Sequence, residues 1–238
     1  MLDTAFDALK TFDWGSDLAA LAPIEDAATA SHGKPEARQD LENRLITALK
    51  GILTRDAQDY ICRKLANVGT AAAVPALAGL LVNKGNSHMS RFALEQIPAP
   101  EAASALRDVL PKVNGDLKVG VISSIGARRD RVAVDALSGL LADSDASVAR
   151  AATLALGAIG SAESVTALQT ALRAAGDRRQ TIIDAILSCA ESLLANNQIA
   201  NASSIYKAFT DESQPRLVRL AATRGLLACA SQPAVRSI

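Results

Sequence analysis

Histidines and cysteines are the side chains of this sequence best suited to bind metals or act as nucleophiles, and they are few. Neither His32 nor His88 has a second histidine, a cysteine or a carboxylate at the spacing that metal ligands need. The cysteines, Cys62, Cys189 and Cys229, are odd in number and far apart, which argues against a disulfide framework. We expect each to be a small buried apolar residue and not a reactive thiol.

Asp143 and Asp145 resemble the paired carboxylates of general acid–base catalysis. They stand where a helix is expected to begin, so helix capping is the preferred interpretation. The sequence has no glycine-rich phosphate loop, no Gly-x-Ser-x-Gly elbow and no assembled Ser/His/Asp set. It therefore predicts no enzyme activity, no cofactor and no metal.

Composition limits the partners. The 238 residues carry 25 basic and 25 acidic side chains, and aromatic residues make up 3%, which disfavours nucleic acid and anionic membranes as partners. Two basic clusters, Arg128–Arg131 and Arg178-Arg179, stand at expected turns and are interpreted as solvated loop ends. With no run of 18 apolar residues and no signal-like start, the sequence predicts a cytoplasmic protein without a membrane segment.

The elements that would position any site are helices that recur at a fixed distance. Residues 134–141 carry apolar side chains at i, i+3, i+6 and i+7, as one buried helix face requires. The same frame, some copies weaker, begins at Leu45, Val74, Ala103, Val134, Val165 and Ala202, in steps of 29, 29, 31, 31 and 37 residues. A period of this length indicates a repeat array.

Each frame is followed by a second predicted helix. In four units this helix ends in an apolar residue followed by a helix stop: Gly69, Pro98, Gly126 or Gly160. Polar breaks such as Asn83–Asn86 and Asp143–Asp145 separate the two helices and offer Asn or Asp as caps. The repeat unit is thus predicted to be two antiparallel helices.

The phrase from Asp143 to Ala152, followed by Ala155–Gly160, resembles the short HEAT-like repeats named after phycobilisome bilin lyases. The resemblance covers residues 36–238 and is closest over 130–175. It implies an all-α fold: a right-handed solenoid of about six antiparallel helix pairs. The Trp-Leu-Gly-Tyr pattern of tetratricopeptide repeats and the Thr-Pro-Leu-His phrase of ankyrin repeats do not occur.

Two segments are expected. Residues 1–34 are acidic and hold Phe6, Phe12 and Trp14, and they are interpreted as capping helices or, alternatively, as a hook for a partner. Residues 35–238 form the solenoid. Ser231-Gln-Pro233 with Val235 and Ile238 matches the start of another first helix, so the last repeat is expected to be truncated and the chain to be part of a longer bacterial repeat protein.

The resemblance also implies a binding surface, because second helices line the concave face of HEAT-like arrays. We expect a polar stripe three, seven and ten residues before each helix stop, interrupted by Ala66, Val119 and Gly157, to contact a partner protein or peptide. The stripe consists of Asp59, Cys62, His88, Arg91, Glu95, Asp116, Ser123, Arg150 and Thr153.

The predicted function is a non-catalytic scaffold or adaptor that binds another protein on this face. Two alternatives remain: a bilin-lyase-like chaperone and, with less support, a HEAT-fold DNA glycosylase-like enzyme. HEAT-fold hydroxylases hold iron with His-Glu pairs, and the sequence has no His-Glu dipeptide, which excludes that activity.

Overall fold

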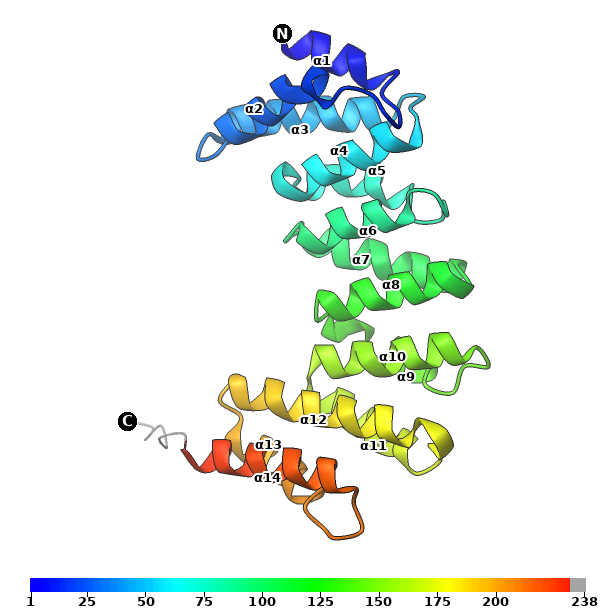
Figure 1. Ribbon diagram of the computed structural model, residues 1–238, viewed down its shortest axis with the longest axis vertical. Coiled ribbons are helices and arrows are strands. Elements are labelled where there is room, and N and C mark those ends of the chain that lie inside the picture. Colours follow the sequence, from blue (N-terminus) through cyan, green and yellow to red (C-terminus); the bar gives the residue numbers. More distant parts are fainter. Residues whose placement is uncertain (232–238) are drawn as a thin grey trace. The chain divides into compact units, whose positions relative to one another are not determined.

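The computed structural model describes residues 1–231, and its regular elements over that range are helices. Contacts between residues divide the chain into two units, Met1–Ser124 and Ile125–Ile238. The expected boundary after residue 34 thus falls inside the first unit. Figure 1 shows successive helices stacked along the chain within each unit. None of the helices in this range is long and apolar enough to cross a bilayer.

The first unit begins with two helices that precede the repeats, α1 and α2, which pack together; α2 also packs on α3. Helix pairs follow, each with a first and a second helix. The bounds are α1 Leu2–Leu9, α2 Ala22–Ala30, α3 Pro35–Leu49, α4 Arg55–Val68, α5 Val74–Ala78, α6 Ser87–Gln96, α7 Pro100–Val109 and α8 Gly115–Ala127, whose last three residues belong to the second unit.

The second unit continues the same alternation. Its helices are α9 Val134–Gly139, α10 Ala146–Ile159, α11 Ala162–Leu172, α12 Arg179–Ala195, α13 Ile199–Lys207 and α14 Arg216–Ser231. The second helices α10 and α12 pack closely together, and α12 also contacts α11, α13 and α14. The six predicted helix pairs are therefore α3 with α4 through α13 with α14, and the all-α fold is confirmed.

The apolar frames form the core of each unit. Leu77 and Leu106 on first helices of the first unit are fully buried, as are Leu65 and Leu94 on its second helices. In the second unit the same holds for Leu137, Leu168 and Leu156. Burial of these faces is what drives each pair to stack on the next, because a single pair has too little apolar surface to fold alone.

Helix ends agree with the sequence in part. Asp145 caps α10, since its carboxylate accepts a hydrogen bond of 2.8 Å from the Ser147 N–H. Gly160 ends α10 with φ +64°, the left-handed conformation expected of a glycine stop. Gly126 is a different case: α8 continues through it to Ala127, so its interpretation as a stop was wrong.

Gly126 lies within a helix because it faces a neighbour closely. A Cβ built on it would stand 2.8 Å from the Ala155 Cα of α10. Glycine here allows two second helices to approach each other. The further first helix predicted at 233–238 lies outside the described residues.

Candidate functional site

The predicted stripe divides into exposed and buried residues. Ten residues before each stop, His88, Asp116 and Arg150 are exposed, and the Asp59 side chain is 16% exposed. Ser123 is also exposed. These five residues come from four different second helices.

Cys62 and Thr153 are corrections to that stripe. Cys62 has no exposed surface and Thr153 is 2% exposed, so neither can contact a partner in this conformation. Both lie seven residues before a stop, a position that turns toward the core and the adjacent second helix. Burial raises the pKa of the Cys62 thiol to about 12, which leaves it protonated and unreactive at neutral pH.

Arg91 and Glu95 are half-buried because they bridge to the next second helix. The Ser124 hydroxyl donates a hydrogen bond of 2.6 Å to Glu95 Oε1, and Arg91 Nη1 lies 3.4 Å from Ser124 Oγ. A Cβ on Gly120 would stand 2.4 Å from the guanidinium carbon of Arg91, so this glycine makes room for the arginine. Burial lowers the pKa of Arg91, and the nearby Glu95 opposes that shift.

Asp59 takes part in a similar bridge between α4 and α6. The side-chain amide of Asn86 donates to Asp59 Oδ1 at 3.3 Å and to the Arg55 carbonyl at 3.4 Å. Asn86 is the residue before α6, where the sequence predicts a helix cap, but its side chain makes no capping hydrogen bond to α6. Loss of solvent raises the pKa of Asp59, and the Asn86 hydrogen bond opposes this. These polar groups hold neighbouring repeats together.

A row of side chains that shares only His88 with the predicted stripe points outward from α4 and α6, two and six residues before each stop and, on α6, also ten residues before it. We call it the second-helix face, and it consists of Arg63, Asn67, His88, Phe92 and Gln96, all exposed. Phe92 is 40% exposed and is the aromatic residue of this row. Arg63 forms no ion pair within the described part of the chain.

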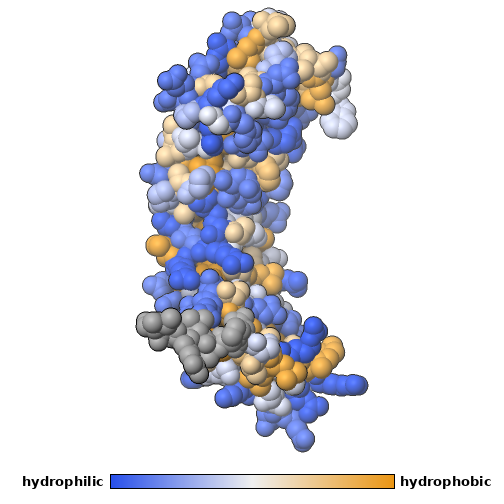
Figure 2. All heavy atoms as spheres, turned by 90° about the vertical axis from the view of Figure 1, so that its left-hand side faces the viewer, coloured by the Kyte–Doolittle hydropathy of each residue, from blue (hydrophilic) through white to orange (hydrophobic). Residues whose placement is uncertain are grey.

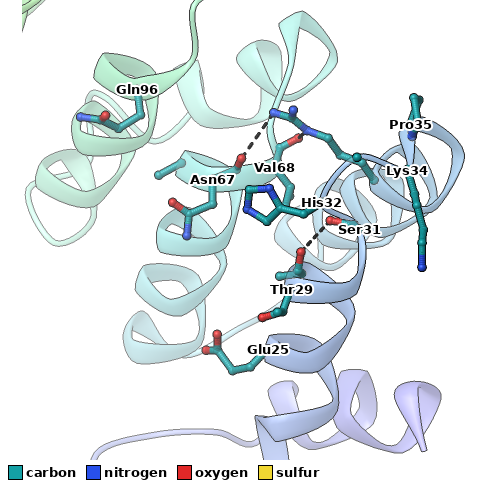
Figure 3. Close-up of a pocket in the computed structure, with 13 residues that line it drawn as sticks. Glu25, Thr29, Ser31, His32, Lys34, Pro35, Asn67, Val68 and Gln96 are labelled. Carbon is teal, nitrogen blue, oxygen red and sulfur yellow. Dashed lines mark hydrogen bonds between the residues drawn. The ribbon is translucent and has the colours of Figure 1, made fainter.

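The second-helix face ends at a pocket. Asn67 and Gln96 line it together with Glu25, Thr29 and His32 from α2 and the turn that follows. Figure 3 shows the His32 ring between Ser31 and Asn67, with Glu25 and Gln96 on opposite sides of the opening. Amide, imidazole and hydroxyl groups converge here, and they can donate to and accept from a polypeptide backbone.

Two interactions hold the pocket walls. The Arg38 guanidinium, from α3, donates to the Val68 carbonyl at 2.8 Å and lies 3.3 Å from the Asn67 carbonyl, so it caps the C-terminal end of α4. On the opposite wall Lys64 Nζ binds Glu25 Oε2 at 2.6 Å and lies over the Tyr60 ring. Side chains fixed in this way give the pocket a defined shape.

The two basic clusters stand at different turns of the second unit. Arg178 precedes α12 and donates to the Leu141 carbonyl after α9, whereas Arg129 and Arg131 follow the end of α8. Beside Arg129 and Arg131, the Asp130 carboxylate accepts a hydrogen bond from the Val132 N–H. Within residues 1–231 no group of three or more His, Cys, Asp or Glu side chains is placed to hold a metal ion.

Comparison with known families identifies one type of repeat in part of the chain. Residues 103–187 match the family model for HEAT repeats. No curated protein matches the sequence. One similar solved structure is human deoxyhypusine hydroxylase in complex with glycerol, at 17% identity and a TM-score of 0.40, covering 97% of this chain and 96% of that one. Another is an engineered protein, at 20% identity and a TM-score of 0.42, covering 96% and 69%.

Both TM-scores are too low to support an argument about activity. The match to HEAT repeats, however, falls on the helix pairs from α7 to α12, and the pairs before and after it have the same construction. Residues 103–187 are thus HEAT repeats, and the helix pairs on either side of them continue the same architecture.

Proposed function

We propose that this protein is a non-catalytic binding module that holds a segment of another protein on its second-helix face. HEAT repeats generally mediate contacts between proteins, which supports this class of function. The observation that carries the proposal is the exposed Phe92 ring, with the unpaired Arg63 on the neighbouring helix and an adjoining pocket.

The chemistry of the face suggests how such a segment is held. Phe92 offers apolar surface for one side chain of the partner, and aromatic and arginine residues contribute most of the binding energy at many interfaces. Arg63 offers a charge for a carboxylate. Asn67 and Gln96 stand on adjacent helices and line one pocket, so their amides can pair with the backbone of an extended segment.

Affinity capture from source lysate tests the proposal with three forms of the protein: wild type, Phe92→Ala with Arg63→Glu, and the matched control Val82→Ala. Val82 is also an exposed apolar residue of the first unit, but it lies in the turn between α5 and α6. We expect one protein to be retained by wild type and control and lost by the double variant.

Nucleic acid and pigments are quantified in the same eluates. Equal retention of the protein by the double variant would show that the second-helix face does not bind it. Enrichment of pigment or nucleic acid alone would instead favour the chaperone or the glycosylase-like alternative.

A further inference from the structure

Among the helices of residues 1–231, α14 carries the largest number of exposed large apolar side chains. Leu217, Leu220 and Leu227 are 77%, 55% and 67% exposed. The opposite side of the helix is buried through Val218, Ala222 and Cys229. Figure 2 shows apolar residues gathered toward the lower end of the face in view. Leucines exposed to this extent on one helix indicate a surface that a partner covers.

The charge on this face is entirely positive. α14 carries Arg216, Arg219 and Arg224 and no acidic residue. Arg216 and Arg224 are exposed, and the 3.6-residue period places them on the same side as the leucines. Neither forms an ion pair within residues 1–231. Arg216 therefore lies at the edge of the leucine stripe and Arg224 lies within it, one heptad after Leu217, and both guanidinium groups are free to pair with a partner.

The spacing of the leucines fits a helical partner. Residues 217, 220 and 227 stand at i, i+3 and i+10, the first apolar position of one heptad and the second positions of two successive heptads. A helix packed along this seam meets all three leucines, whereas an extended strand follows a different repeat.

We propose that the outer face of α14 binds an amphipathic helix of a partner protein whose apolar stripe is flanked by Asp or Glu. Carboxylates on the partner pair with Arg216 and Arg224 while its apolar residues cover the leucines. The same face of a second copy fits less well, because it brings arginines and no carboxylate to the contact. The proposal is independent of the second-helix face, which lies in the other unit.

The test uses two synthetic helical peptides of equal length with leucine at i, i+3, i+7 and i+10. One has Glu and the other has Lys at the flanking positions. Binding to the full chain is measured by fluorescence anisotropy at low and high salt. We expect the Glu peptide to bind at least about tenfold more tightly, with an advantage that shrinks as salt rises.

Variants assign the binding to the face. Arg216→Glu with Arg224→Glu should reverse the preference between the peptides, and Leu220→Gln with Leu227→Gln should abolish binding of both. The controls are Arg131→Glu and Val132→Gln, which change an exposed charge and a 74% exposed apolar residue elsewhere in the same unit. Circular dichroism verifies that each variant folds.

Three results would overturn the proposal. The first is that neither peptide binds, and the second is that both bind equally, which means nonspecific apolar association. The third is concentration-dependent self-association of the wild type that Leu220→Gln with Leu227→Gln removes, because the occupant would then be a second copy.

Discussion

Neighbouring second helices are held together by different means in the two units. In the first unit, polar side chains bridge them: Asn86 reaches Asp59, and Ser124 reaches Glu95. In the second unit, small residues let the backbones approach. A Cβ on Gly157 would stand 3.1 Å from the Ala185 Cα, and one on Gly126 would stand 2.8 Å from the Ala155 Cα.

The difference shows that one repeat geometry can rest on two kinds of contact. Polar bridges leave space between helices and can adjust, because side chains rotate. Backbone contact through glycine cannot adjust without moving a helix. The first unit should therefore be sensitive to the loss of polar groups, and the second to the addition of a single methyl group.

The largest expected effect comes from Gly126→Ala. The added methyl group overlaps the backbone of α10, so despite the better helix propensity of alanine we expect a loss of about 1–3 kcal/mol in the free energy of unfolding. Urea unfolding monitored by circular dichroism measures it. Gly139→Ala is the matched control, because nothing lies within 4 Å of its added Cβ and its stability should not fall.

The reactivity of two buried thiols shows which unit loses stability in Gly126→Ala. Cys62 lies in the first unit and Cys189 in the second, and burial raises the pKa of each to about 12, so alkylation requires local opening. Gly126→Ala should accelerate iodoacetamide labelling of Cys189 more than that of Cys62. The reverse order, determined by mass spectrometry of peptides, would contradict the comparison.

Glu42→Gln probes another polar contact of the first unit, between α3 and the turn after α4. Glu42 is 2% exposed, and its carboxylate accepts a hydrogen bond of 2.6 Å from the Thr70 N–H and another from the Thr70 hydroxyl. Replacing the charge with an amide keeps an acceptor but weakens both bonds, so we expect a loss of about 1 kcal/mol. Glu42→Gln should also accelerate the labelling of Cys62 more than that of Cys189.

Gly120→Ala should cost far less than Gly126→Ala, although its Cβ also overlaps a neighbour. The overlapping atoms belong to the Arg91 guanidinium, which can swing toward solvent. We expect stability to change by less than about 0.5 kcal/mol, since the gain in helix propensity offsets the displaced contact. In an Arg91→Ala background the same substitution should become stabilising, and a double-mutant cycle in urea measures that coupling.

Asp59→Asn has the smallest expected effect, and it depends on pH. Burial raises the pKa of Asp59 above its ordinary value of 3.8, so the folded protein keeps this proton when the unfolded chain has lost it. The wild type therefore loses stability as pH rises through that window, and Asp59→Asn does not. The stability difference between variant and wild type should rise with pH and then level off; a constant difference would show that Asp59 is not desolvated.

Most of the fold follows from the sequence because the apolar frames recur with a helical period. The frames at Val74, Val134 and Val165 each coincide with a first helix. Gly126 shows where such reasoning ends. A glycine after the last apolar residue serves equally as a helix stop or as a point of close approach, and only the position of α10 distinguishes the two.

The candidate site was predicted less well, for a geometric reason. The side chains most exposed on a second helix point directly away from its buried apolar side chains. The predicted stripe, at three, seven and ten residues before each stop, lies roughly 60° around the helix from that direction, toward the neighbouring helix. That opposite direction contains Phe92 and Arg63, six residues before their stops. The exposed face could therefore have been found from the helical period of the sequence. The stripe instead assigned Cys62 and Thr153 to the solvent-exposed surface, although they face adjacent helices.

The first helices α5 and α9 have a consequence for dynamics. They contain five and six residues, whereas α4 and α10 contain 14 each. A helix of little more than one turn has few amide groups bonded within it and relies on packing to stay formed. In deuterium-exchange experiments the amides of α5 and α9 should exchange well before those of α4 and α10, so that these two repeats loosen along the layer of first helices while the second helices keep their shape.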